Sequence, residues 1–160
     1  MTSSTFVASL ALAAILAGCA GIPPHATHAM HDHGMVSVKS PHSASETMTR
    51  LEAQVKQRGL AVVARVDHAA AAAKIGRVLR PTELLIFGNP QAGTPLMVCT
   101  QAAGIDLPMK ALVWVDASSQ VWLGYNAPAW VVQRHGGGDC PATVNVAQAL
   151  AAIAAATVAP

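Results

Sequence analysis

Two β-rich runs separated by a short turn place the strongest constraint on the fold of this chain. Residues 111–115 and 120–125 are rich in β-branched and aromatic side chains. Between them, Asp116 to Ser119 is a cluster of turn-forming residues. This pattern predicts a β-hairpin, which favours an α+β fold over a parallel α/β fold.

The rest of the globular region alternates between helical and strand patterns. Ser43 to Glu46 has the capping-box sequence, Asp67 can cap a second helix, and Asn89-Pro90 can open a third. We predict strands at residues 60–66 and 82–87, and helices at residues 46–58, 69–79, 90–103, 128–134 and 141–158. Together with the hairpin, these predict a small mixed or antiparallel four-stranded sheet packed against several helices. A parallel βαβ arrangement of the first two strands is the alternative.

Composition limits the chain to one domain and argues against nucleic acid as a partner. The chain has 160 residues, which is enough for one domain of ordinary size. It is 52% hydrophobic and 11% charged, with a formal net charge of +2. A charge this small supplies no basic surface for phosphate contacts.

The N-terminus contains a pattern of exported proteins. Residues 6–17 are an uncharged apolar run, shorter than the ~20 residues needed to span a bilayer but typical of a signal peptide. The sequence Leu-Ala-Gly-Cys at residues 16–19 resembles the lipobox of bacterial lipoproteins. That resemblance implies a signal peptide at residues 1–18, a lipid on Cys19 and a membrane anchor. With Ala20 after the cysteine, it favours the outer membrane, facing the periplasm.

One observation leaves an alternative to this interpretation open. Residues 1–5 contain no Lys or Arg, although signal peptides usually carry positive charge there. Residues 6–19 could instead form a buried helix, with Cys19 as a core thiol.

A histidine-rich segment follows. Residues 20–44 contain three prolines and almost no charge, so we interpret residues 19–44 as the lipidated cysteine and a flexible tether, and residues 45–160 as the domain. Imidazole and thioether ligands suit copper, so the tether is a candidate metal site. The candidate ligands are His25, His28, His31, His33, Met30 and Met35. A spacer without a ligand role, or weak adventitious metal binding, is the alternative.

Two cysteines remain in the domain. Export would place them in an oxidising compartment, where a disulfide between Cys99 and Cys140 could persist. Cys99 lies in an apolar run, so an unpaired core thiol is the alternative.

Several ordered motifs resemble the domain-of-unknown-function 302 family. They are residues 80–90, 93–97, 104–114, 121–126 and 134–136, and the resemblance covers residues 47–157. It implies a compact α+β domain, often a homodimer, with no established activity. The sequence departs from the family pattern at Ala127 and at the glycine run 136–138.

Polar residues within these motifs form the candidate pocket. They are Arg80, Glu83, Asn89, Thr94, Asp106, Lys110, Tyr125, Asn126, Arg134 and His135. Glu83 and His135 would form an acid/base pair if they meet in space. The alternative is structural: Asn89 caps a helix, Asp106 and Asn126 support turns, and Arg134 pairs with Glu83. The common hydrolase, zinc-protease and phosphate-loop signatures are missing.

These observations predict an exported, lipid-anchored envelope protein of uncharacterised activity. Its domain is most simply a small-ligand or metal-binding module, with copper or another transition metal at the tether as the candidate cofactor. A small enzyme with a pocket around Glu83, Tyr125 and His135 is one alternative. A homodimeric interaction scaffold is the other.

Overall fold

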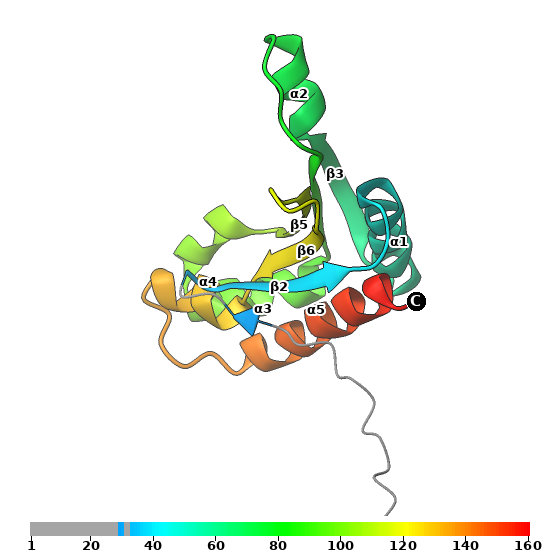
Figure 1. The fold of residues 1–160 in the computed structure, drawn as a ribbon. Helices are drawn as coiled ribbons and strands as arrows, with labels where there is room; N and C mark the ends of the chain where they lie inside the picture. Colours follow the sequence, from blue (N-terminus) through cyan, green and yellow to red (C-terminus); the bar gives the residue numbers. More distant parts are fainter. Residues whose placement is uncertain (1–28, 31–32) are drawn as a thin grey trace, which may run out of the picture.

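The computed structural model describes residues 29–30 and 33–160, which form one antiparallel sheet and several helices (Figure 1). The six strands lie in the order β1-β2-β6-β5-β4-β3, and every neighbouring pair is antiparallel. The α+β class is therefore confirmed, and the predicted strand count of four is corrected to six. The elements are β1 (Ala29–Met30), β2 (Met35–Ser40), α1 (Ala44–Gln57), β3 (Ala61–Asp67), α2 (His68–Lys74), β4 (Thr82–Gly88), α3 (Pro90–Cys99), the 3-10 helix η1 (Gln101–Asp106), β5 (Met109–Val115), β6 (Val121–Asn126), α4 (Pro128–Arg134) and α5 (Ala142–Val158).

The predicted hairpin is present as β5 and β6, and the Asp116 side chain organises its turn. The Asp116 carboxylate accepts hydrogen bonds from the Ser118 hydroxyl at 2.6 Å, the Trp122 indole at 2.8 Å and the Gln120 backbone N–H at 3.0 Å. The bonds from Ser118 and Trp122 are the main causes that lower the pKa of Asp116 to about 2. This carboxylate therefore remains ionised at neutral pH and holds both ends of the turn.

The prediction that residues 20–44 form a flexible spacer is wrong for residues 35–40. These residues form β2, which pairs with β6 from Met35 opposite Asn126 to Ser40 opposite Val121. Val38 is buried, and the buried Ser40 hydroxyl shares a 2.7 Å hydrogen bond with the Thr47 hydroxyl. The sheet therefore begins before residue 45, the domain boundary expected from composition.

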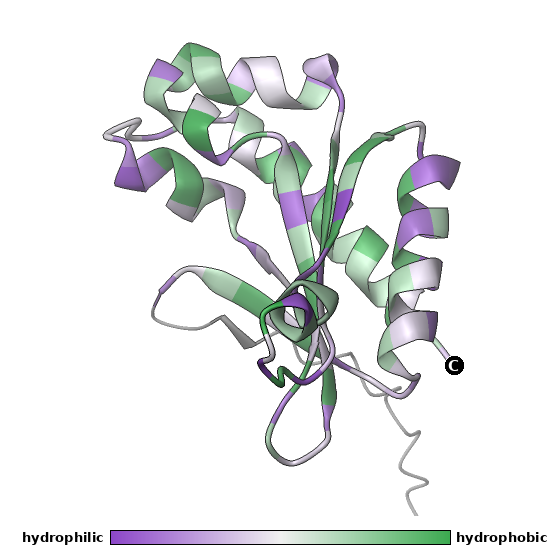
Figure 2. Ribbon diagram, turned by 90° about the horizontal axis from the view of Figure 1, so that it is seen from above, coloured by the Kyte–Doolittle hydropathy of each residue, from purple (hydrophilic) through white to green (hydrophobic). Residues whose placement is uncertain are grey.

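Helices α1 and α5 cover one face of the sheet and form the core with it. Met48, Leu51 and Val55 of α1 are each at most 1% exposed, as their spacing of three and four residues predicts. The Ser43 hydroxyl accepts from the Glu46 backbone N–H at 3.2 Å, so the predicted N-cap is present. Figure 2 shows the strands largely in the hydrophobic colour, whereas α1 carries hydrophilic bands as well.

An arm projects from this body. The outer end of β3, helix α2 and the connection to β4 extend away from the other elements (Figure 1). Helix α2 ends at Lys74, before the predicted Leu79, and Gly76 follows with a φ of 69°. Ile75 and Val78 on this connection are 75% and 102% exposed. The arm therefore presents apolar side chains to solvent.

The lengths and compositions of the helices in residues 29–30 and 33–160 bear on membrane spanning. None of the helices in that part of the chain combines the length and the apolar character that a bilayer span requires.

Candidate functional site

An apolar pocket of about 470 Å³ lies between α3, η1 and the ends of β3 and β4. This volume falls within the ~300–1,000 Å³ of ordinary small-molecule sites. The walls come from β3, β4, α3, η1, the start of β5, the connections between them, and α5. The lining residues are Ala61, Val63, Gly88, Asn89, Pro90, Ala92, Gly93, Thr94, Leu96, Met97, Gly104, Leu107, Pro108, Met109 and Val146.

Small and missing side chains create this space. A Cβ atom built at Gly93 would first meet the Leu107 side chain, at 3.9 Å, and one at Gly88 would first meet Pro108, at 3.5 Å. The turn into α3 is fixed by Asn89, whose side chain accepts a 2.8 Å hydrogen bond from the Ala92 backbone N–H. The predicted helix cap at Asn89 is thus present, and it holds the first turn of α3 over the cavity.

The pocket is almost entirely apolar. Of the described residues that line it, Asn89 and Thr94 alone carry hydrogen-bonding side chains, and none is ionisable. Asn89 is half-buried and Thr94 is exposed, so both polar groups lie toward the rim. Burying a charged group here without a partner would be costly. The arrangement therefore suits a ligand with an apolar body.

Two links fasten the α3–η1 wall to the C-terminal part of the domain. A disulfide joins Cys99, the last residue of α3, to Cys140, just before α5. The Asp106 carboxylate at the end of η1 lies 2.7 Å from His135 Nε2 and 3.6 Å from Arg134. Three of the ten candidate residues therefore form one cluster. It holds η1 against the end of α4.

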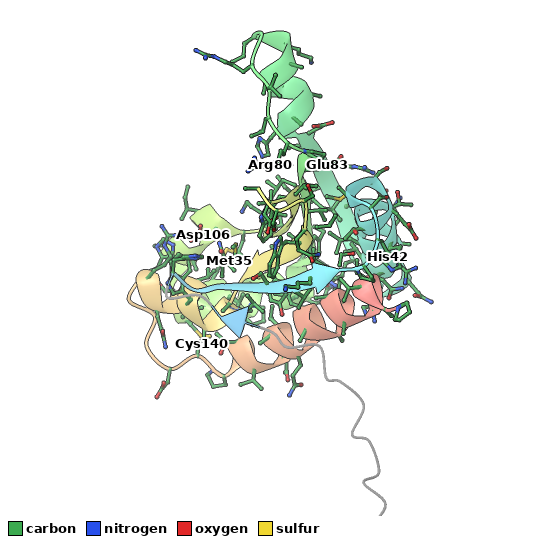
Figure 3. All side chains as sticks on the ribbon, in the orientation of Figure 1. Met35, His42, Arg80, Glu83, Asp106 and Cys140 are labelled. Atoms are coloured by element: carbon green, nitrogen blue, oxygen red, sulfur yellow. A yellow bond between two sulfur atoms is a disulfide. The ribbon has the colours of Figure 1, made fainter. Side chains whose placement is uncertain are left out.

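Glu83 and Arg80 lie elsewhere, at the base of the arm (Figure 3). Glu83 pairs with Arg65 across the β3–β4 ladder, and Arg65 also reaches Glu52 of α1 at 3.4 Å. The hydrogen bonds that Arg65 donates to the Glu83 carboxylate are the main cause that raises the pKa of Arg65. Arg80 donates from Nε to the Val115 carbonyl at 3.0 Å. The expected Glu83–Arg134 pair is therefore replaced by Glu83–Arg65.

The structure does not bring Glu83, Tyr125 and His135 together. Glu83 contacts Arg65, and His135 contacts Asp106. Tyr125 is only 6% exposed within the core, where burial raises its pKa. The acid/base pair of Glu83 and His135 is thus not formed. The prediction of an enzyme pocket around Glu83, Tyr125 and His135 is therefore wrong.

The remaining candidates occupy two further places. Lys110 donates to the backbone carbonyls of Asp106 at 2.6 Å and Pro108 at 3.1 Å, which places its charge beside the pocket wall. Asn126 is exposed at the end of β6. Of the ten candidates, only Asn89 and Thr94 line the pocket, because most of its wall is glycine, proline, alanine and methionine.

Three of the six predicted metal ligands lie outside the described residues, and of the other three, His33 is exposed in the turn before β2. His25, His28 and His31 lie outside the described residues, whereas the backbone of Met30 pairs with Val36 and Met35 is fixed in β2. Among the described residues, no group of three or more His, Cys, Asp or Glu side chains is arranged to hold a metal ion.

Comparison with known families gives one match, which covers most of the chain. Residues 36–157 match the family described as "Domain of unknown function DUF302". A solved structure, the uncharacterized conserved protein DUF302 from Bacillus stearothermophilus, superimposes with a TM-score of 0.69. It is 22% identical and covers 78% of this chain and 98% of its own. At this identity the likeness establishes the fold alone.

The curated relatives are longer proteins from Brucella. "Fluoride-specific ion channel FluC 1" of Brucella suis biovar 1 is 51% identical over 113 residues, which are 71% of this chain and 44% of that protein. The protein of the same name in Brucella abortus biovar 1 is also 51% identical, over 41% of its length. The chain thus spans less than half the length of these relatives.

Proposed function

Because the chain belongs to the DUF302 family, whose description assigns no activity, we propose a function from its geometry: it is a small-molecule binding module whose ligand occupies the pocket under α3. The observation that carries this proposal is an apolar pocket of about 470 Å³ with polar side chains only at its rim, among the residues described. An apolar ligand body would gain about 25 cal/mol for each Å² removed from water. Thr94 and Asn89 would meet a polar end of the ligand.

Gly93→Leu should abolish most of this binding. The new side chain starts 3.9 Å from its first neighbour, so it enters the cavity without a backbone clash and occupies the ligand's space. We expect the dissociation constant of the neutral apolar fluorophore N-phenyl-1-naphthylamine to rise at least about tenfold, since losing a few buried methylene contacts costs more than ~1.4 kcal/mol. An equilibrium fluorescence titration measures it.

The matched control is Ala53→Leu, which adds the same side chain to an exposed position of α1 outside the pocket lining. It should bind the fluorophore like the wild-type protein. Equal affinity for the Gly93→Leu and Ala53→Leu proteins would remove the pocket from the proposal.

We further propose that the module is held in the bacterial cell envelope by a lipid on Cys19. The lipobox-like sequence at residues 16–19 supports this proposal. Those residues lie outside the described part of the chain.

Copper binding is a second proposal for the segment before β2, supported by its closely spaced histidines. Replacing His25, His28 and His31 by Ser should weaken Cu(II) binding at least about tenfold, because several imidazole ligands are removed from one ion. Competition titration against a chelator measures the change, with exposed His68→Ser as the control. Unchanged affinity in the triple variant would reduce this segment to a spacer.

Homodimerisation is supported by the arm. It exposes Ile75 and Val78, and the sheet face opposite α1 and α5 carries half-buried Leu84 and Leu112. A second copy offers both surfaces at once, as a two-fold interface requires. The double variant Ile75→Asp, Val78→Asp should sediment as a monomer in analytical ultracentrifugation, whereas wild type and the exposed Ala53→Asp control should sediment as dimers. A monomeric wild-type protein would overturn this proposal.

A further inference from the structure

A second apolar cavity adjoins the pocket on the other flank of α3. It has a volume of about 240 Å³. The two cavities share Gly88, Ala92, Met109 and Val146 as lining residues, so they lie side by side at the first turns of α3. From the sheet, Gly88 contributes only backbone to this shared wall, and Met109 of β5 contributes one unbranched, flexible side chain. We treat the two adjacent cavities as the two lobes of one site.

Helix α3 covers this space but is packed loosely. Within this fully described helix, Leu96 is the single buried residue. Pro95 lies inside the helix, where it lacks the N–H that would donate to the preceding turn. Gly93 adds backbone freedom one turn after the start. The helix is held at its ends by the Asn89 cap and by the Cys99–Cys140 disulfide. An occupant beneath it would supply packing that its own side chains do not.

The chemistry of the lining is uniform along both lobes. Of the described residues that line the second cavity, Gln91 and Asn145 alone are polar, and both are exposed. Ionisable side chains are missing from the described walls of both lobes. A compact ligand would fill one lobe and leave the other empty, whereas an unbranched chain can cover both. Apolar contact is then nearly continuous along its length.

We propose that the ligand of this site is an unbranched hydrocarbon chain that passes beneath α3 and occupies both cavities. This inference rests on the proposed function and specifies its ligand class. It requires that affinity grow with chain length, by about fourfold for each added methylene that is buried. It also requires that a side chain placed in the second cavity weaken long chains selectively.

The test uses neutral straight-chain alkanols from hexanol to decanol, which displace N-phenyl-1-naphthylamine from the protein. In the wild type, each added methylene should tighten binding by about fourfold. Ala149→Leu places a larger side chain in the second cavity only. It should weaken decanol at least about tenfold relative to hexanol, because the far end of the longer chain loses its buried contacts. Gly93→Leu should weaken both alkanols, and Ala53→Leu neither.

The outcomes separate this inference from the function on which it rests. If Ala149→Leu leaves decanol affinity unchanged while Gly93→Leu abolishes it, the ligand is confined to the first cavity and the hydrocarbon-chain inference is overturned. If the wild-type protein binds neither the fluorophore nor any alkanol, the proposed function is overturned as well. Thermal melting checks that each variant folds. Gln91→Trp, at an exposed position that lines the second cavity only, is the replacement if Ala149→Leu does not fold.

Discussion

Replacing both Cys99 and Cys140 by alanine should lower the free energy of unfolding by about 4 kcal/mol. The disulfide closes a loop with a sequence separation of 41 residues, and in the chain-entropy account a loop of this length restricts the unfolded state by about that amount. Cys140 is 6% exposed, so alanine is chosen to avoid burying a new hydroxyl group. Urea denaturation followed by circular dichroism measures the change.

The same experiment contains its own control. Wild-type protein denatured in a thiol reductant should have the stability of the double variant, because it loses the same covalent link. A loss below about 1 kcal/mol in both samples would show that the native contacts around α3 and α5, and not the disulfide, hold this part of the domain together. Because Cys99 ends α3, fluorophore affinity should fall along with stability.

Gly34→Ala should destabilise the domain by about 3 kcal/mol, the second largest effect that we expect. Gly34 has a φ of 77°, and a Cβ atom there would lie 2.0 Å from Cγ of Trp130. The Arg134 guanidinium lies 4.7 Å over the Trp130 ring, so a shift of the ring would also disturb this cation–π contact. The Gly34 carbonyl also accepts from the Ala127 N–H at 2.9 Å, so the backbone is fixed as well.

A second glycine separates the two causes of this effect. Gly59 has a φ of 70°, but nothing lies within 4 Å of its hypothetical Cβ. Gly59→Ala should therefore cost only the left-handed backbone term, about 1–2 kcal/mol. Urea denaturation of both variants gives the difference. Equal losses would mean that the Trp130 contact contributes nothing at Gly34.

The elements with strong local signals could be predicted from the sequence, and β2 could not. The β5–β6 hairpin has turn residues between two apolar runs, and α1 has both a cap and helical spacing. Strand β2 is short, has two serines and a lysine, and follows a segment rich in proline and histidine. Its stability comes from pairing with β6, far along the chain, and sequence-local reasoning does not detect such pairing.

The pocket under α3 is harder to predict from the sequence than the fold, because polar and charged residue types do not mark an apolar pocket. Charged residues such as Glu83 and Asp106 found ion-pair partners at separate ends of the domain. The pocket is instead defined by small side chains at Gly88 and Gly93, whose proximity depends on how α3 lies over the sheet. Asn89 was expected for its polarity and does line the pocket, although its side chain also caps α3.

The most direct test of the account is an amide nitrogen–proton correlation spectrum of the protein, titrated with decanol. Gly88, Gly93 and Gly104 line the pocket, whereas Gly59 and Gly76 do not. We predict saturable shifts of the three pocket glycine amides with one common dissociation constant, and unchanged positions for the other two. Shifts at Gly59 and Gly76 without shifts at the pocket glycines, or no shifts at all, would contradict the claim that the cavity under α3 binds an apolar ligand.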